Sequence, residues 1–299
     1  MRNTRQLSSA MLGAGVLILA ACGSSAASSS TAAPVPAPTA SPTSTAVPAT
    51  AAGGTTMDTA AMMELPAYTA GWKLALTSDA AGATVTANEV AFKVAASGYE
   101  LSCKQAGKSL SEMFGHYHVL LDKSLVDMKC TPDASVSMQN VKPGEHTIAV
   151  VPALNDHAEV MASEVEFKFN YAPTSPLPEV VDAPAAGAPS IKIVSPKPGE
   201  TVKGDFDVVV EITNFKLNCD LFGKPGLFGI GHYHVNLDST SGPMMGMGTM
   251  LGMGCTTTFH ASTDGLKTGE KHTVIALLTD NSHAPLTPAV AGSVDVTIG

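Results

Sequence analysis

Short runs rich in Val, Ile, Phe and Thr fill the chain from about residue 70 onward, and clusters of Gly, Pro, Asn and Asp separate them at intervals of roughly ten residues. Apolar and polar residues alternate in the runs at 165–171 and 293–298, as they do in half-buried strands. Helical periodicity is nearly absent. The pattern predicts an all-β fold.

The N-terminal segment has a different pattern. Arg2 and Arg5 precede an apolar run that ends at Leu19-Ala20-Ala21-Cys22, which is typical of a signal peptide. Small residues ahead of a cysteine resemble the bacterial lipobox, and this resemblance implies that Cys22 carries lipid. We therefore expect an exported protein that is anchored to a bacterial membrane on its periplasmic or cell-surface side. The alternative, an ordinary secretory signal with an incidental cysteine, also predicts export.

Two segments contain mostly small residues and proline. Residues 22–64 are chiefly Ser, Thr, Ala and Pro, so they cannot bury enough apolar surface to offset the entropy of ordering, and a disordered tether is predicted. The predicted organisation is a signal peptide at 1–21, this tether, a first domain at 65–172, a Pro/Ala linker at 173–188 and a second domain at 189–299.

The two predicted domains are copies of one another. The pentapeptide "GHYHV" occurs at 115–119 and again at 231–235, and the alignment runs without a gap from Leu101–Asp122 onto Leu217–Asp238. Each copy has about a hundred residues, an ordinary size for one hydrophobic core. Many short strands in a unit of this size predict two tandem immunoglobulin-like β-sandwiches.

The cysteines fit an exported duplicated protein. The sequence has five, and lipidation of Cys22 would leave two in each copy at matching places. In an oxidising compartment this predicts two disulfides, Cys103–Cys130 and Cys219–Cys255. The alternative is thiolate ligation of a metal, although no close Cys-x-x-Cys pair is present.

Eight of the nine histidines occupy four repeated positions. Alternate residues of a strand share a face, so the two histidines of each pentapeptide project together and can share a metal if another strand or loop supplies a third ligand. Imidazole suits zinc and copper. The candidate ligands are His116, His118, His146 and His157 with Asp122 in the first copy, and His232, His234, His272 and His283 with Asp238 in the second. The alternative is that the histidines only support the fold of a structural or adhesive surface module.

The second copy contains an insertion, "GPMMGMGTMLGMG", whose methionines are further candidates. Thioether sulfur is a soft ligand suited to Cu(I). The alternative is a flexible apolar loop, because methionine adapts to irregular contacts. These candidates are Met244, Met245, Met247, Met250 and Met253.

Charge and motifs narrow the function class. The chain has 26 acidic and 17 basic residues, and no basic cluster lies outside the signal peptide. This argues against a nucleic-acid partner, which needs clustered Lys and Arg. No nucleophile elbow, phosphate loop or H-E-x-x-H helix is visible, so the sequence predicts a binding protein of the cell envelope, for a metal ion or an envelope component, and not an enzyme.

The motifs "GHYHVNLD", "GEKHT" and "NSHAPL", after the opening strand "SPKPGETV", resemble a family of exported bacterial Ig-like domains of unknown function that carry GHxHVxLD, GxHT and NDHxPL. The resemblance covers both copies and implies a β-sandwich and export, with no reaction. The first copy departs at Glu159, where the family has proline. The second departs at Ser282, where the family has aspartate, which weakens the second site if that acidic residue matters.

Overall fold

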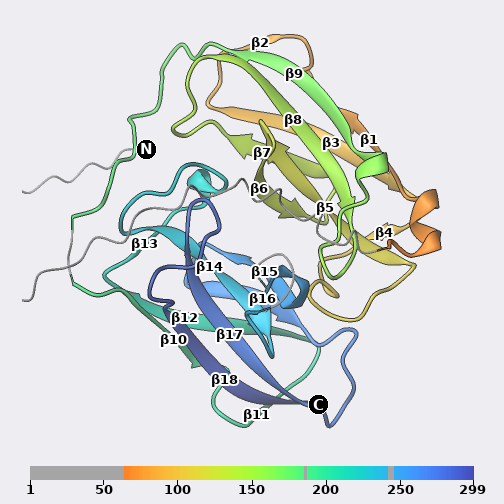
Figure 1. Cartoon of the computed structure of the whole chain (residues 1–299), viewed down its shortest axis with the longest axis vertical. Coiled ribbons are helices and arrows are strands. Elements are labelled where there is room, and N and C mark those ends of the chain that lie inside the picture. The colour runs from red at the N-terminus through yellow and green to blue at the C-terminus, as the bar shows by residue number, and fades with distance from the viewer. Residues whose placement is uncertain (1–63, 185–186, 242–245) are drawn as a thin grey trace, which may run out of the picture. The chain divides into compact units, whose positions relative to one another are not determined.

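The computed structural model describes residues 64–184, 187–241 and 246–299. The described residues belong to one compact unit. Its strands build two sandwiches of the same topology in chain order, so the predicted all-β class with two tandem immunoglobulin-like sandwiches is confirmed (Figure 1). The signal peptide, Cys22 and the tether up to residue 63 lie outside the described residues. No helix in the described part of the chain is long and apolar enough to span a membrane.

The first sandwich packs a small antiparallel sheet against a larger one. The small sheet has the order β1-β3-β7, and the large one β2-β9-β8-β5-β4, with β6 also paired to β5. The 3-10 helices η1 (Ala67–Gly71) and η2 (Met161–Ser163) lie before β1 and before β9. The strands are β1 (Lys73–Thr77), β2 (Thr84–Val85), β3 (Glu89–Ser97), β4 (Glu100–Leu101), β5 (Phe114–Leu121), β6 (Ser124–Lys129), β7 (Asp133–Ser137), β8 (Gly144–Ala153) and β9 (Val165–Tyr171).

The second sandwich repeats this plan. Its small sheet has the order β10-β12-β16, and its large sheet β11-β18-β17-β14-β13, with β15 also paired to β14. The 3-10 helices are η3 (Cys219–Leu221) and η4 (Met247–Thr249). The strands are β10 (Ser190–Ser195), β11 (Glu200–Val202), β12 (Asp205–Thr213), β13 (Lys216–Leu217), β14 (Ile230–Leu237), β15 (Met250–Gly254), β16 (Thr258–Ser262), β17 (Lys271–Asp280) and β18 (Ala291–Ile298).

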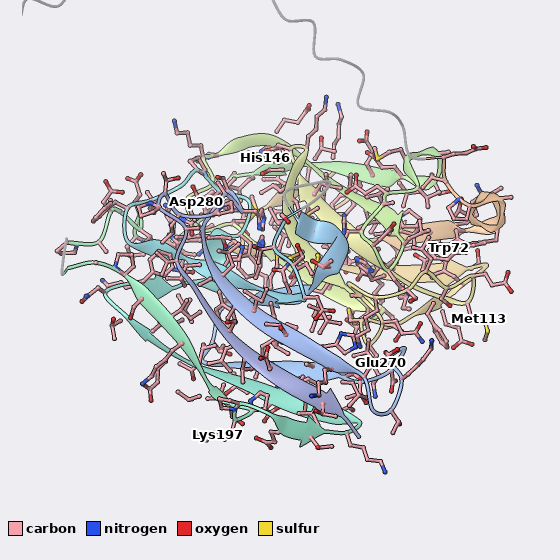
Figure 2. The ribbon with its side chains drawn as sticks, turned by 60° about the horizontal axis from the view of Figure 1, so that its bottom comes forward. Trp72, Met113, His146, Lys197, Glu270 and Asp280 are labelled. Carbon is pink, nitrogen blue, oxygen red and sulfur yellow. A yellow bond between two sulfur atoms is a disulfide. The ribbon has the colours of Figure 1, made fainter. Side chains whose placement is uncertain are left out.

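Each sandwich has its own apolar core between its two sheets. Alternate residues of the strands supply it, which explains the alternation seen in the sequence: Val90, Phe92 and Val94 of β3 are buried while their neighbours are exposed. Trp72, labelled in Figure 2, is fully buried in the first core. Its ring stacks on that of Tyr99, with ring centroids 4.1 Å apart.

Both predicted disulfides are present, Cys103–Cys130 and Cys219–Cys255. Each connects the segment before the histidine strand to the segment after the strand that follows it. The predicted linker is held by hydrogen bonds where it is described: the side chain of Asn140 accepts from Val180 N and donates to Val180 O. Ala183 is buried, and its N–H donates to Phe228 O.

Candidate metal centres

The histidine strands β5 and β14 lie inside the large sheets. In β5, Tyr117 and Val119 are fully buried and belong to the first core. His116 and His118 project from the opposite face, as the strand alternation predicts, and they too are fully buried. The side of the sheet that carries the histidines is therefore covered, and the imidazoles are removed from solvent.

Glycine precedes the first histidine in both copies because the sheet leaves no room for a side chain. A Cβ at Gly115 would lie 2.6 Å from the Trp72 ring and 2.8 Å from Ala153 O, and one at Gly231 would overlap Thr279 O. The neighbouring backbone would have to move to admit it.

We expect Gly231→Ala to lower the free energy of unfolding by about 1–3 kcal/mol, the usual cost of overpacking. Gly71→Ala is the matched control, because a Cβ there meets nothing within 4 Å. Urea unfolding of the two variants measures the difference. Equal stability of Gly231→Ala and Gly71→Ala would contradict this account of the motif.

A tight turn after β8 supplies a third histidine. His157 N–H donates to Leu154 O, Leu154 N–H donates to Ala158 O, and His157 has a left-handed backbone with φ of 66°. The equivalent His283 has φ of 69°. This conformation is costly for a residue with a side chain, and such strain is retained mainly where the surrounding structure fixes it, often at functional sites.

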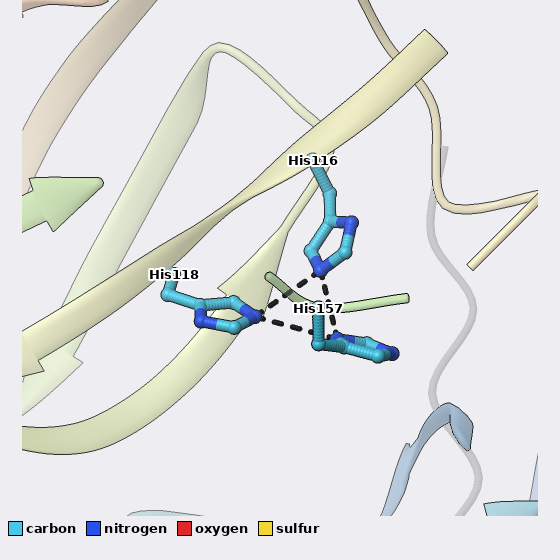
Figure 3. A group of neighbouring side chains, drawn as sticks. All are labelled: His116, His118 and His157. Carbon is cyan, nitrogen blue, oxygen red and sulfur yellow. Dashed lines mark hydrogen bonds between the residues drawn. The ribbon is translucent and has the colours of Figure 1, made fainter. Parts of the chain in front are cut away.

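Together His116, His118 and His157 form a buried triad (Figure 3). His116 Nε2 lies 3.2 Å from His118 Nε2 and 3.0 Å from His157 Nδ1, and His118 Nε2 lies 3.4 Å from His157 Nδ1. Tetrahedral zinc with Zn–N bonds of about 2.05 Å places its nitrogens about 3.3 Å apart. The triad thus has nearly the spacing that one shared ion requires.

The second copy reproduces the arrangement. His232 Nε2 lies 3.1 Å from His234 Nε2 and 3.0 Å from His283 Nδ1. All three side chains are buried, and one nitrogen from each lies within 4.8 Å of the others. The same geometry therefore occurs twice in one chain.

Hydrogen bonds outside the first triad fix which nitrogens carry protons. His157 Nε2 lies 2.7 Å from Met250 O, and because a carbonyl only accepts, Nε2 donates and Nδ1 is left unprotonated. His118 Nδ1 donates to the Glu159 carboxylate at 2.7 Å, which leaves its Nε2 unprotonated. Two lone pairs then face each other with no hydrogen between them. A cation would relieve this repulsion.

Burial favours the neutral form of His116, His157, His232, His234 and His283. Desolvation, together with the neighbouring imidazoles, lowers the pKa of His116 and His232 well below the ordinary value. Burial lowers the pKa of His157 and of His234 to about 3. The pKa of His283 is also lowered, first by burial. Neutral imidazole is the form that binds metal.

The fourth repeated histidine does not join either triad. His146 begins β8, whereas the partners of the triad histidines, Val151 and Ala153, lie at the other end of that strand. Its Nδ1 hydrogen-bonds to Asp122, 2.7 Å away, and Asp122 also accepts from Thr147 N–H. The expectation that His146 would meet the other histidines is therefore wrong, because His146 lies at the opposite end of β8. Its hydrogen bond with Asp122 instead links the end of β5 to the start of β8.

The second copy requires the same correction. His272 Nδ1 hydrogen-bonds to Asp238 at 2.7 Å, and Thr273 N–H donates to the same carboxylate. The pairs His146–Asp122 and His272–Asp238 therefore lie away from the triads.

Among the candidate methionines, Met244 and Met245 lie outside the described residues. Met247 begins η4, and Met250 is fully buried at the start of β15. Met253 lies opposite His234 in the pairing of β14 with β15. Of the three candidate methionines that the structure describes, strand register thus places one, Met253, beside a triad.

The two triads differ in one carboxylate. Glu159 contacts His118 in the first copy, and Pro285 occupies the aligned position in the second. No carboxylate is within ion-pair distance of His232, His234 or His283 in the described part of the chain. Sequence reasoning missed the role of Glu159, although its departure from the family pattern was visible.

The loop histidines make reciprocal contacts. His157 of the first sandwich donates to Met250 O of the second, and His283 of the second donates to Leu125 O of the first at 2.8 Å. Leu125 and Met250 occupy equivalent places, each opposite the strand residue that follows the β-bulge. Each copy therefore helps to orient a triad histidine of the other.

A lysine at the equivalent position of each copy also contacts the other sandwich. Lys108 Nζ donates to Ser262 O at 2.6 Å, and Lys224 Nζ donates to Ser137 O at 3.2 Å. Ser137 ends β7 and Ser262 ends β16, which are equivalent strands. Burial lowers the pKa of both lysines to about 8.

No protein-family model and no curated protein matches the sequence. Similar solved structures include a biofilm-associated protein's BSP domain (15% identity, 75% of this chain and 29% of that chain, TM-score 0.20). A putative membrane anchored protein from Corynebacterium diphtheriae is also similar (11% identity, 75% of this chain and 58% of that chain, TM-score 0.22). So is the structure of Dpr11 IG1 bound to DIP-gamma IG+IG2 (8% identity, 76% of this chain and 98% of that chain, TM-score 0.20). The chain thus spans 29% and 58% of the length of the two proteins named first.

Proposed function

We propose that this chain is an exported, lipid-anchored protein of the bacterial cell envelope that binds copper or zinc in two His₃ sites, one in each sandwich. The observation that carries the proposal is the duplicated buried triad, with nitrogen–nitrogen distances of 3.0 to 3.4 Å in the first copy and 3.0 and 3.1 Å in the second. The two disulfides support the exported location, because such bonds persist in oxidising compartments.

The hydrogen bonding of the triads supports metal binding over a purely structural role. Three imidazoles that face one another at hydrogen-bond distance cannot all be satisfied by their own protons, and His116 Nδ1 and His232 Nδ1 are buried without a hydrogen-bond partner among the described residues. Histidines that served only the fold would be expected to find such partners. A bound ion would use the lone pairs directed into each triad.

Binding is tested with purified protein that is stripped by a chelator, dialysed against Zn(II) or Cu(II), and assayed by elemental analysis. We expect about two ions per chain, and saturating metal at 100 times the dissociation constant raises stability by about 2.7 kcal/mol per site. His116→Ala combined with His232→Ala removes one ligand from each triad, so it should abolish retention. His260→Ala is the control, because that side chain is 83% exposed and pairs with Asp207.

An outcome in which the double variant retains as much metal as the wild type would overturn the proposal. A melting temperature that neither ion raises would favour the alternative, a structural or adhesive surface module whose histidines support the sandwich.

A further inference from the structure

We propose that Met128 and Met253 supply a fourth, thioether ligand to the two triads, so that these sites bind copper as Cu(I) in preference to zinc. This inference rests on the proposed metal binding by the triads and specifies the ion. Four kinds of observation support it: strand register, a cavity beside the methionines, the pattern of the duplication, and the charge around the sites.

Strand register places one methionine beside each triad. His118 pairs with Met128 across the antiparallel strands β5 and β6, and His234 pairs with Met253 across β14 and β15. Directly opposite residues of an antiparallel pair project from the same face, with Cβ atoms about 4.5–5.5 Å apart. Each methionine therefore stands on the histidine face, next to a ring whose Nε2 belongs to the triad.

Open space lies beside both methionines. A cavity of about 410 Å³ is lined by His116, Met128 and Met253 among others. Both methionine side chains are partly buried. A flexible thioether beside a cavity can reach an ion without a rearrangement of the backbone.

The duplication retains this methionine where its neighbours changed. Asp127 and Lys129 flank Met128 and form an ion pair at 2.8 Å. β15 pairs with β14 as β6 pairs with β5, so the expectation that the whole methionine-rich segment is an insertion is wrong for its last five residues. The aligned neighbours of Met253 are Gly252 and Gly254, which can form no such pair. The surroundings of the strand have thus diverged, while the thioether and the imidazole opposite it occur in both copies.

Charge favours a monovalent ion. The triads are buried, and the second has no carboxylate partner in the described part of the chain, so a divalent ion there would carry two uncompensated charges in a medium of low polarity. The Born cost of burial rises with the square of the charge, so Cu(I) is far less costly to bury than Zn(II). Imidazole and thioether together match the softness of Cu(I).

The test compares Cu(I) and Zn(II) affinities of the full exported chain. Cu(I) is held in ascorbate without oxygen and titrated against a chromophoric Cu(I) chelator, and Zn(II) is titrated against a zinc chelator. We expect Met128→Leu combined with Met253→Leu to weaken Cu(I) binding at least tenfold and to change Zn(II) binding less than threefold. Leucine conserves the side-chain volume, so the fold should tolerate it.

Met113→Leu is the matched control, because Met113 is 57% exposed and the same substitution there should change neither affinity. X-ray absorption of the Cu(I)-loaded wild type should show copper–sulfur scattering that disappears in the double variant. The four cysteines of the sandwiches are in disulfides and supply no thiolate.

The two proposals fail in different ways. Zn(II) and Cu(I) binding of equal strength, unchanged by the methionine substitutions and without copper–sulfur scattering, overturns the thioether assignment and leaves the His₃ sites intact. A wild-type chain that binds neither ion overturns both.

Discussion

The metal-free protein should lose at least about 4 kcal/mol of stability between pH 7 and pH 5. The folded pKa of His157 and of His234 is about 3, whereas an unfolded histidine titrates near 6.5. Between these values the unfolded chain binds more protons, so stability is complete above pH 6.5 and is lost as the pH falls toward the folded pKa. His157 and His234 each cost about 2 kcal/mol over this interval, and the lowered pKa values of His116, His232 and His283 add to the loss.

Urea unfolding of chelator-treated protein at pH 5, 6 and 7 measures this loss. His157→Gln combined with His234→Gln should flatten the dependence on pH, and the exposed His260→Ala should leave it unchanged. Carboxyl groups of the unfolded chain titrate near pH 4, below this range. Stability that stays constant between pH 7 and pH 5 would show that the triads accept protons without cost.

Removal of either disulfide should lower the free energy of unfolding by roughly 3.5 kcal/mol. The bonds close loops with sequence separations of 27 and 36 residues, and the chain-entropy model gives nearly the same value for both because the cost rises only with the logarithm of loop length. The measurement is urea unfolding of Cys103→Ala with Cys130→Ala, and of Cys219→Ala with Cys255→Ala.

The reduced wild type is the control for the alanine side chains themselves. Reduction should destabilise the protein by about as much as the sum of the two double variants, if the sites are independent. A loss below about 1 kcal/mol in both double variants would mean that the loops are already fixed in the unfolded chain.

Much of this architecture could be predicted from the sequence because the duplication provides its own alignment. The repeated pentapeptide placed His116 and His118 on one face, and the repeated cysteines indicated the disulfide pairs. Strand periodicity alone is sufficient for both inferences, since a strand has a fixed two-residue repeat.

The members of each site could not all be predicted, because they depend on which ends of the strands are adjacent. His146 and His157 are separated by the length of β8, and only the register of β5 with β8 shows which of them is near His116. Met128 could not be predicted as a candidate ligand for the same reason, because only the register of β5 with β6 shows that it lies opposite His118.

The contacts of His157 with Met250 and of His283 with Leu125 are self-complementary, since each surface patch meets its own counterpart. That relation is typical of two-fold homodimers, in which every contact occurs twice. A homodimer of single sandwiches with this patch would make the same pair of contacts. Because the two halves here belong to one chain, they can differ at a single aligned position, as Glu159 and Pro285 do, whereas two identical subunits cannot.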